Sequence, residues 1–531
     1  MAGGGEAAAL AFQLAELKRR SALSYEQLGR KAHLSRSTVH RYCTGSAVPP
    51  AFAPIEAIAN ACGADRAELT KLYRLWERAG RPAVTNALIQ DERLFRPRPP
   101  QVDERAVHPF RRSRWAAVRP AIAAVLAVLL LVGGSTNGPV AVSPIQAPMW
   151  THAPRALEPE FVGVTANSNT GQMPSFDVGS VRLWNSRTRW QNLEPARGQY
   201  DWTTLDRLVD GARSKGLPVV LTFGGTPAWA APNGKKSPYT DESRASPPDD
   251  LADWERFVHT VADKYRGRIG AYELWDMANH PNLFSGSMAE LAEMARLAGR
   301  AIRAADPAAT VVCPSMGELW DPVMLGELRE FAELGGYDHC DAAAVKLSAR
   351  NDSDPPETML SLAREIDAAL HAGGAGVVLW STGSAYDVNL HQPVDADRGA
   401  QHAVRFYLSG LYAGYRRMYF YNWGSAKLPI VLQPVGGPYT KAAGHVARLR
   451  QWLAGSRIHS CGQGRAAGLP EDLWQCRFDR DGKTFLIWWT VDRSLRVPAP
   501  AGTTSVEDLD GGTRAGSDLT VTGSPILVRI G

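Results

Sequence analysis

The stretch from Val181 to Gly224 reads VRLWNSRTRWQNLEPARGQYDWTTLDRLVDGARSKGLPVVLTFG. It begins and ends with short apolar runs of the kind that form buried strands. Between them, WTTLDRLVDGARSKG has apolar residues at helical spacing and polar residues on the opposite face. The stretch therefore predicts a strand, an amphipathic helix and a second strand.

The same strand-helix repeat recurs along residues 161–455. The chain holds eight such apolar runs, which read FVGVTA, VGSVRLW, PVVLTFG, AYELWD, TVVCPSM, DAAAVKL, GVVLWST and RMYFYNW. Eight repeats over about 290 residues predict a (β/α)8 barrel, in which the working face lies at the C-terminal ends of the strands.

Length and charge indicate several domains. The chain has 531 residues, 44% of them hydrophobic and 21% charged, and is too long for a single core. Residues 1–119 carry 20 Lys or Arg against 11 Asp or Glu, whereas residues 120–531 carry 39 against 43. The basic and acidic parts are expected to face different partners.

An uncharged stretch separates these parts. The sequence AIAAVLAVLLLVGGSTNGPVAV, residues 121–142, is long enough for a bilayer core that requires about 20 residues. We predict a single transmembrane helix over 116–138, and the arginines before it predict a cytoplasmic N-terminus and an extracellular C-terminal barrel. A buried core helix is the alternative, but the apolar residues run right round the helix. A basic linker over 80–114 and an extracellular stalk over 139–160 would flank the span.

The cysteines follow this predicted placement. Cys43 and Cys62 are expected to be free thiols, and the remaining four are disulfide candidates because they would lie outside the cell. Cys461 with Cys476 is the better pair, and Cys313 with Cys340 is the other. No cysteine or histidine spacing indicates zinc, so neither a metal nor a cofactor is expected.

Residues 8–79 are predicted to be an all-α head. Ser24 would cap the helix YEQLGRKA, a tight turn follows, and RSTVHRYCTG forms a second short helix. This pattern predicts a helix-turn-helix whose second helix can lie in a DNA major groove. The predicted core residues are Leu28, Ala32, Leu34 and Val39. The predicted DNA-contacting residues are Arg36, Ser37, Thr38, His40 and Arg41.

The stretch SYEQLGRKAHLSRSTVHRYCTG resembles the helix-turn-helix family of phage repressors and Cro over about 70 residues. The resemblance implies DNA as the partner and two half-sites read by a homodimer. The alternative is a structural anchor whose helix-turn-helix binds protein. The exposed positions of Arg36 and Arg41 favour DNA.

Tryptophans gather at the predicted strand ends, where flat indole faces suit sugar rings. Buried tryptophan in the core is the plainer explanation for some of them. We expect a carbohydrate-shaped pocket, and its candidate residues are Arg182, Trp184, Trp229, Trp275, Asp276, Asn279, Lys346, Trp380, Tyr421 and Trp423.

Residues 161–455 resemble the retaining glycoside hydrolase barrels of the clan that includes β-xylosidases, cellulases and β-galactosidases, most clearly from Val181 to Ala230. The resemblance implies that Arg182 supports the pocket and that Trp423 forms its floor. Residues 456–531 resemble the β-rich domain that often follows such barrels.

Retaining hydrolysis requires two carboxyl groups about 5 to 5.5 Å apart. The family carries its acid in a W-N-E-P-N pattern, where this chain reads WDMAN, and its nucleophile in a W-x-T-E pattern, where this chain reads WSTG. The two glutamates are thus replaced by Met277 and Gly383, neither of which can transfer a proton or attack carbon. Lys346 stands where many members carry His. The barrel is therefore predicted to be a pseudoenzyme without catalytic residues.

The residues leave three hypotheses open. The preferred one is a membrane-anchored one-component transcription regulator whose extracellular barrel binds a glycan or cell-wall fragment. The second is a membrane-anchored hydrolase that uses Asp276 and Asp387, although Asp276 replaces the family's Asn and its simpler role is to bind a sugar hydroxyl. The third is the structural anchor. The expected location is the cell membrane, with a single pass.

Overall fold

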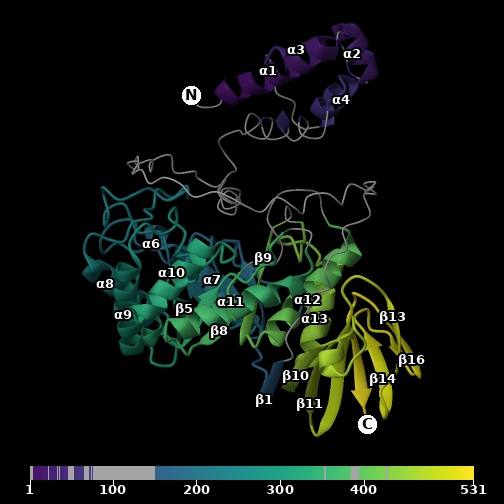
Figure 1. Cartoon of the computed structure of the whole chain (residues 1–531). Coiled ribbons are helices and arrows are strands. Elements are labelled where there is room, and N and C mark those ends of the chain that lie inside the picture. The colour runs from purple at the N-terminus through teal and green to yellow at the C-terminus, as the bar shows by residue number, and fades with distance from the viewer. Residues whose placement is uncertain are drawn as a thin grey trace, which may run out of the picture. The chain divides into compact units, whose positions relative to one another are not determined.

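The protein is represented by a computed structural model that describes most of residues 4–75 and 150–531 (Figure 1). Within these ranges the description leaves out residues 22, 33, 35, 46–52, 65–67, 69–70, 73–74, 352–353, 384–393 and 426–428. The described residues form two compact units, one before residue 88 and one after it.

The first unit is a small helical domain. Its helices include α1 (Gly4–Ser21), α2 (Tyr25–Lys31), α3 (Arg36–Cys43) and α4 (Ala53–Ala61). Ser24 caps α2, because its hydroxyl accepts the Gln27 amide N–H at 3.2 Å while its own N–H donates to the Gln27 side chain at 2.9 Å. The predicted core residues Leu28, Ala32 and Val39 are buried, and Leu34 packs partly buried against them.

The second unit contains a closed barrel of eight parallel strands, which confirms the predicted (β/α)8 fold. The strands follow chain order around the barrel, and the last pairs with the first. They are β2 (Val162–Ala166), β3 (Ser180–Leu183), β4 (Val219–Thr222), β5 (Ala271–Glu273), β6 (Thr310–Val312), β7 (Ala342–Val345), β8 (Val378–Ser381) and β9 (Arg417–Trp423).

Side chains alternate between the two faces of each barrel strand. On β4, Val219 and Leu221 join the large apolar core outside the barrel, whereas Val220 joins a smaller cluster inside it. The same alternation directs Arg182 of β3 and Glu273 of β5 into the barrel interior, since their outward neighbours belong to the outer core. The strand period therefore decides that charged groups enter the barrel.

Helices separate the strands and cover the outside of the barrel (Figure 1). Their apolar faces are buried against the strands; on α9, ten residues are buried and a Ser287–Glu290 capping box begins the helix. The helices are α6 (Trp190–Leu193), α7 (Thr203–Ser214), α8 (Leu251–Lys264), α9 (Met288–Ala305), α10 (Pro322–Glu333), α11 (Met359–Ala372), α12 (Ala396–Tyr412) and α13 (Lys441–Leu453), with short 3-10 helices at Gly336–His339 and Pro356–Thr358.

The C-terminal residues form a β domain that packs on the barrel. Its seven-stranded antiparallel sheet has the order β1-β10-β11-β12-β17-β14-β15, and β13 pairs with β16 beside it. The edge strand β1 comes from residues assigned by sequence to a stalk, and it pairs with β10. The strands are β1 (Trp150–Ala156), β10 (Arg457–Gln463), β11 (Trp474–Arg480), β12 (Lys483–Trp489), β13 (Leu495–Pro498), β14 (Thr503–Asp508), β15 (Thr513–Arg514), β16 (Asp518–Val521) and β17 (Ile526–Ile530), with a 3-10 helix at Arg465–Ala467.

Four cysteines are bonded in pairs and two are free. Cys313 is joined to Cys340, and Cys461 to Cys476. The second bond links paired positions of β10 and β11. Cys43 and Cys62 are buried thiols in the helical domain.

The predicted membrane span needs correction. It was placed over 116–138, outside the described residues. Among the residues that the structure does describe, no helix has the length and apolar character needed to cross a bilayer. The longest of these helices, α1 and α9, have 18 residues and carry charged side chains, whereas a span requires about 20 mainly apolar residues. This finding overturns the fold class with a transmembrane helix and the predicted single-pass location.

Two helical glycines offer a matched test of the barrel packing. A Cβ at Gly211 of α7 would lie 2.0 Å from the Gly171 carbonyl oxygen, whereas one at Gly326 of α10 meets nothing within 4 Å. We expect Gly326→Ala to stabilise the barrel by about 1 kcal/mol through helix propensity. Gly211→Ala should destabilise it, because the clash is with backbone. Urea unfolding of both variants checks this, and equal stabilisation by both would contradict the packing.

Candidate functional site

The candidate site lies at the C-terminal ends of the barrel strands. Arg182 projects inward from β3 and Glu273 from β5. Asp276 follows β5, and Lys346 follows β7 directly. All four side chains are buried. Residues far apart in the sequence thus bring two cations and two carboxylates into one water-poor space.

Arg182 joins the two carboxylates. Its Nε donates to Glu273 Oε2 at 2.5 Å, and a terminal nitrogen donates to Asp276 Oδ1 at 2.5 Å. The Lys346 ammonium donates to the same Asp276 oxygen at 2.6 Å and lies 3.6 Å from Glu273 Oε1. We call this set of four side chains the barrel ion network.

Neutral groups complete the hydrogen bonds of the network. The hydroxyl of Thr222 donates to Glu273 Oε2 at 2.7 Å, and that of Thr382 donates to Oε1 at 2.9 Å. The Lys346 ammonium also donates to the Thr382 carbonyl at 3.1 Å. A buried charge is tolerated when it is paired and hydrogen-bonded. Both conditions hold for Glu273, which has 0% exposure.

The electrostatics keep Glu273 ionised. Burial alone raises its pKa, but the Arg182 and Lys346 charges overcome burial and hold the pKa at about 2. Burial and the nearby Arg182 charge lower the pKa of Lys346, while Asp276 and Glu273 oppose that change. Glu273 therefore lacks the raised pKa that a general acid needs near neutral pH.

The expected acid position is filled by an apolar side chain. Met277 is 1% exposed and packs with Leu283 and Tyr239. The Met277 side chain also contacts Gly317, where an added Cβ would lie 2.6 Å from the Met277 methyl carbon. The position is therefore occupied by a thioether side chain, which cannot exchange a proton.

The expected nucleophile position faces the ammonium. A Cβ at Gly383 would lie 3.5 Å from Lys346 Nζ and 3.4 Å from its Cδ. Asp387, the second fallback acid, lies outside the described residues. Two carboxyl groups in the described part of the barrel mouth, Glu273 and Asp276, are already paired with cations.

The predicted aromatic candidates are mostly buried. Trp275 and Trp423 are each 1% exposed, and their indole N–H groups donate to Leu283 O and to Gln433. Trp380 lies inside the barrel, with the Arg417 guanidinium 4.2 Å from its ring centre. These three rings pack against protein.

Trp184 and Trp229 belong to the loops beyond the strands. Trp184 is 4% exposed and makes an edge contact with the Tyr239 ring. The Arg189 guanidinium lies 3.9 Å from the Tyr239 ring centre. Trp229 is partly buried, and its indole donates to the Glu194 carbonyl. The loops thus hold their aromatic side chains together with arginines.

Asn279 and Tyr421 have different surroundings. The Asn279 amide exchanges two hydrogen bonds with the Gly317 backbone, at 2.7 and 2.8 Å, so it fixes the loop beside Met277. The Tyr421 hydroxyl lies 3.5 Å from the Asn167 amide nitrogen.

The sequence analysis did not identify Thr222 as a site residue. The alternation of side chains along β4 would have shown that Thr222 points into the barrel.

The recognition helix of the head is α3. Arg36, His40 and Arg41 are exposed, and Thr38 is half-buried. The side chain of Ser37 lies outside the described set. His40 makes an edge contact with Tyr25 of α2, 5.1 Å between ring centres. Two cations and an imidazole are therefore presented by one short helix.

Comparisons with known proteins agree with this division. A family profile described as a helix-turn-helix domain matches residues 9–72, and one described as beta-galactosidase matches residues 164–261. Endo-1,4-beta-xylanase 3 of Hypocrea jecorina is 31% identical over 160 residues, which cover 28% of this chain and 41% of the xylanase. The chain thus spans less than half the length of this relative.

Solved structures resemble the larger unit. A family 39 glycoside hydrolase from Bacteroides cellulosilyticus WH2 superposes with a TM-score of 0.53 at 15% identity, over 71% of this chain and 82% of the hydrolase. A monomeric beta-xylosidase from Caulobacter crescentus CB15 gives 0.51 at 13% identity, over 72% and 97%. At such low identities, these superpositions establish only that the fold is shared. The chain joins a helix-turn-helix DNA-binding domain to a glycoside hydrolase-like barrel.

The barrel ion network yields a stability prediction. Glu273→Gln leaves Arg182 and Lys346 with one carboxylate, and we expect a loss of about 3–5 kcal/mol of unfolding free energy. Adding Lys346→Met restores the charge balance and should recover part of that loss, with a coupling of at least about 1 kcal/mol. Urea unfolding measures both values.

A matched control is Glu255→Gln. The side chains of Arg300 and Glu255 are 59% and 30% exposed, so the pair is accessible to water and its loss should cost less than about 1 kcal/mol. Equal costs for Glu273→Gln and Glu255→Gln would show that the network does not stabilise the barrel.

Proposed function

We propose that this chain is a one-component transcription regulator whose glycoside hydrolase-like barrel binds a carbohydrate without hydrolysing it. The observation that carries the proposal is the barrel ion network. Its acids are paired with cations, and Met277 and Gly383 stand where the hydrolase resemblance places the acid and the nucleophile. The DNA-binding head supplies the output.

The chemistry of the network argues against double displacement. Asp276 Oδ1 accepts hydrogen bonds from two cationic donors, Arg182 and Lys346. This oxygen is therefore already engaged as an acceptor by two N–H donors. Glu273 is fully buried, so its carboxylate has no path to an anomeric carbon. Hydrolysis by this pair would first require the network to come apart.

Polar groups at the strand ends support a sugar as ligand. Asn167 has a buried amide oxygen without a hydrogen-bond partner, and a buried acceptor of this kind is normally satisfied by another group. It lies beside Tyr421 at the barrel mouth. Sugar hydroxyls are suitable donors. Since the similar proteins include a xylanase and a beta-xylosidase, we propose a β-linked oligosaccharide.

The head provides DNA recognition. Arg36 and Arg41 extend from α3 into solvent, where they can contact phosphates and base edges. Related heads read two half-sites one helical turn apart. We therefore propose that the regulator acts as a homodimer, and that sugar occupancy shifts the population of the DNA-binding dimer through unequal affinity for the two states.

The test of the proposal separates binding from turnover. The purified chain is titrated with xylo-oligosaccharides and galacto-oligosaccharides, and assayed in parallel with aryl β-xylosides and β-galactosides. We expect saturable binding and no product release above the protein-free blank. Turnover that is lost in Asp276→Asn or Asp387→Asn would instead show a hydrolase. Absence of any glycan binding would remove the carbohydrate ligand.

The DNA prediction concerns the two exposed arginines. A target site is selected from random duplexes, and affinity is measured over a range of salt concentrations. Arg36→Ala and Arg41→Ala should each weaken binding at least about tenfold, and loss of one phosphate contact should reduce the salt slope by about 1. Arg19→Ala on α1, where Arg19 pairs with Glu16, serves as the control. Unchanged affinity in both α3 variants, or the lack of any selected site, would favour a protein-binding role.

A further inference from the structure

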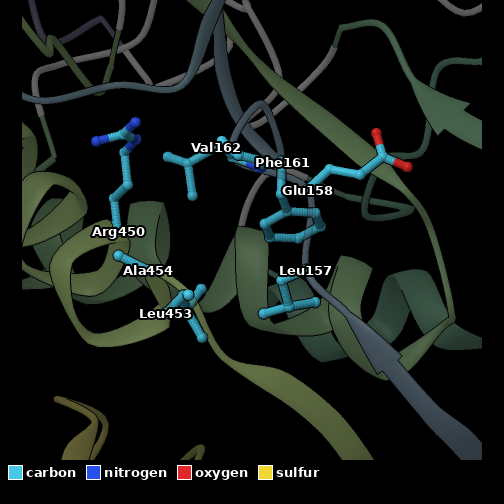
Figure 2. A pocket seen from close by; sticks show the side chains of 9 residues that line it. Leu157, Glu158, Phe161, Val162, Arg450, Leu453 and Ala454 are labelled. Atoms are coloured by element: carbon cyan, nitrogen blue, oxygen red, sulfur yellow. The ribbon is translucent and has the colours of Figure 1, made fainter. Parts of the chain in front are cut away.

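A cavity of about 190 Å³ lies beside Val162 (Figure 2). Because Val162 is the first residue of β2, the cavity is at the N-terminal end of the barrel, opposite the strand ends that carry the barrel ion network. One wall is the segment that connects β1 to β2, residues 157–161, together with Val162 at the start of β2. The other wall is the end of α13 with the turn after it. It is therefore a separate feature from the barrel mouth.

The lining of this cavity is mainly apolar. Leu157, Phe161, Val162 and Leu453 are buried residues that belong to the main core. Pro159, Ala454 and Gly455 complete the apolar part. An apolar cavity of about 150 Å³ in another protein holds a benzene molecule. The space is thus large enough for a body the size of one ring.

Two charged side chains border the cavity, and they are engaged differently. Glu158 turns away from it (Figure 2) and accepts a hydrogen bond from Arg417 Nε at 2.9 Å. Arg450 pairs through one terminal nitrogen with Asp177 at 2.5 Å. Its Nε is buried and has no hydrogen-bond partner. Only the arginine therefore has a donor left for a ligand.

A carboxylate fits the remaining donor. Arginine binds carboxylates along one edge of its guanidinium with parallel hydrogen bonds, and the Nε edge of Arg450 is the one that Asp177 leaves unused. A buried N–H without an acceptor is unfavourable, so a ligand oxygen would correct an existing deficit. The apolar walls would take up the rest of the ligand.

We propose that this cavity is a binding site for a small carboxylic acid with an apolar, ring-sized body. The acid group pairs with the Nε edge of Arg450, and the body contacts Phe161 and Leu453. This site is independent of the proposed sugar site. Asp177 competes for the same guanidinium, so its negative charge lowers the affinity of the site for the acid.

The experiment is calorimetric titration of the full chain with phenylacetate as the probe and phenylacetamide as its uncharged counterpart. We expect saturable phenylacetate binding with a Kd of about 1 mM or tighter, and weaker binding of the amide. Arg450→Gln should weaken phenylacetate at least about tenfold, and Leu453→Trp should abolish binding by filling the cavity. Asp177→Asn should tighten binding because it removes the competing carboxylate.

The control is Arg448→Gln, which changes an arginine of the same helix that does not line the cavity. Thermal melts verify that each variant folds. No saturable binding, equal affinity for acid and amide, or unchanged affinity in both Arg450→Gln and Asp177→Asn would overturn the proposal. The Asp177→Asn arm predicts a gain, so it remains decisive if Arg450→Gln fails to fold.

Discussion

Charge balance inside the barrel is the constraint on which the larger unit depends. Arg182 and Lys346 lie where water is scarce, and each uncompensated buried charge would cost several kcal/mol. Glu273 and Asp276 neutralise them at hydrogen-bonding distance. Strands β3, β5 and β7 must therefore hold their register, because a one-residue slip would move the charges to the apolar outer face.

The same requirement decides what the barrel mouth can do. The Arg182 and Lys346 charges lower the pKa of Glu273, so this carboxylate is a poor proton donor near neutral pH. This supports the proposal that the barrel binds a carbohydrate without hydrolysing it. Met277 and its apolar neighbours close the adjacent position with carbon. The two ends of the barrel consequently offer different chemistry: a polar, charge-balanced mouth and an apolar cavity with one arginine donor at the base.

The sequence was sufficient to predict the barrel because the patterns of strands and helices are local. Short apolar runs such as β4 and the spacing of about 3.6 residues in α7 recur as eight strand-helix repeats, which are typical of a closed barrel. It was also sufficient for the helix-turn-helix, where Ser24 and the tight turn fix α2 and α3. The span predicted over 116–138 has no counterpart among the helices that the structure describes. The strand β1 was overlooked because its partner β10 lies about 300 residues later along the chain.

By itself, the sequence predicted that Met277 and Gly383 stand at the acid and nucleophile positions, because the motifs that flank them can be recognised locally. Tertiary structure alone decided that Asp276 and Glu273 pair with Arg182 and Lys346, and that most of the predicted sugar-facing tryptophans are core. The physical reason is that burial and charge pairing depend on contacts between distant strands. No local pattern records which side chain will lie 2.5 Å from another 94 residues away.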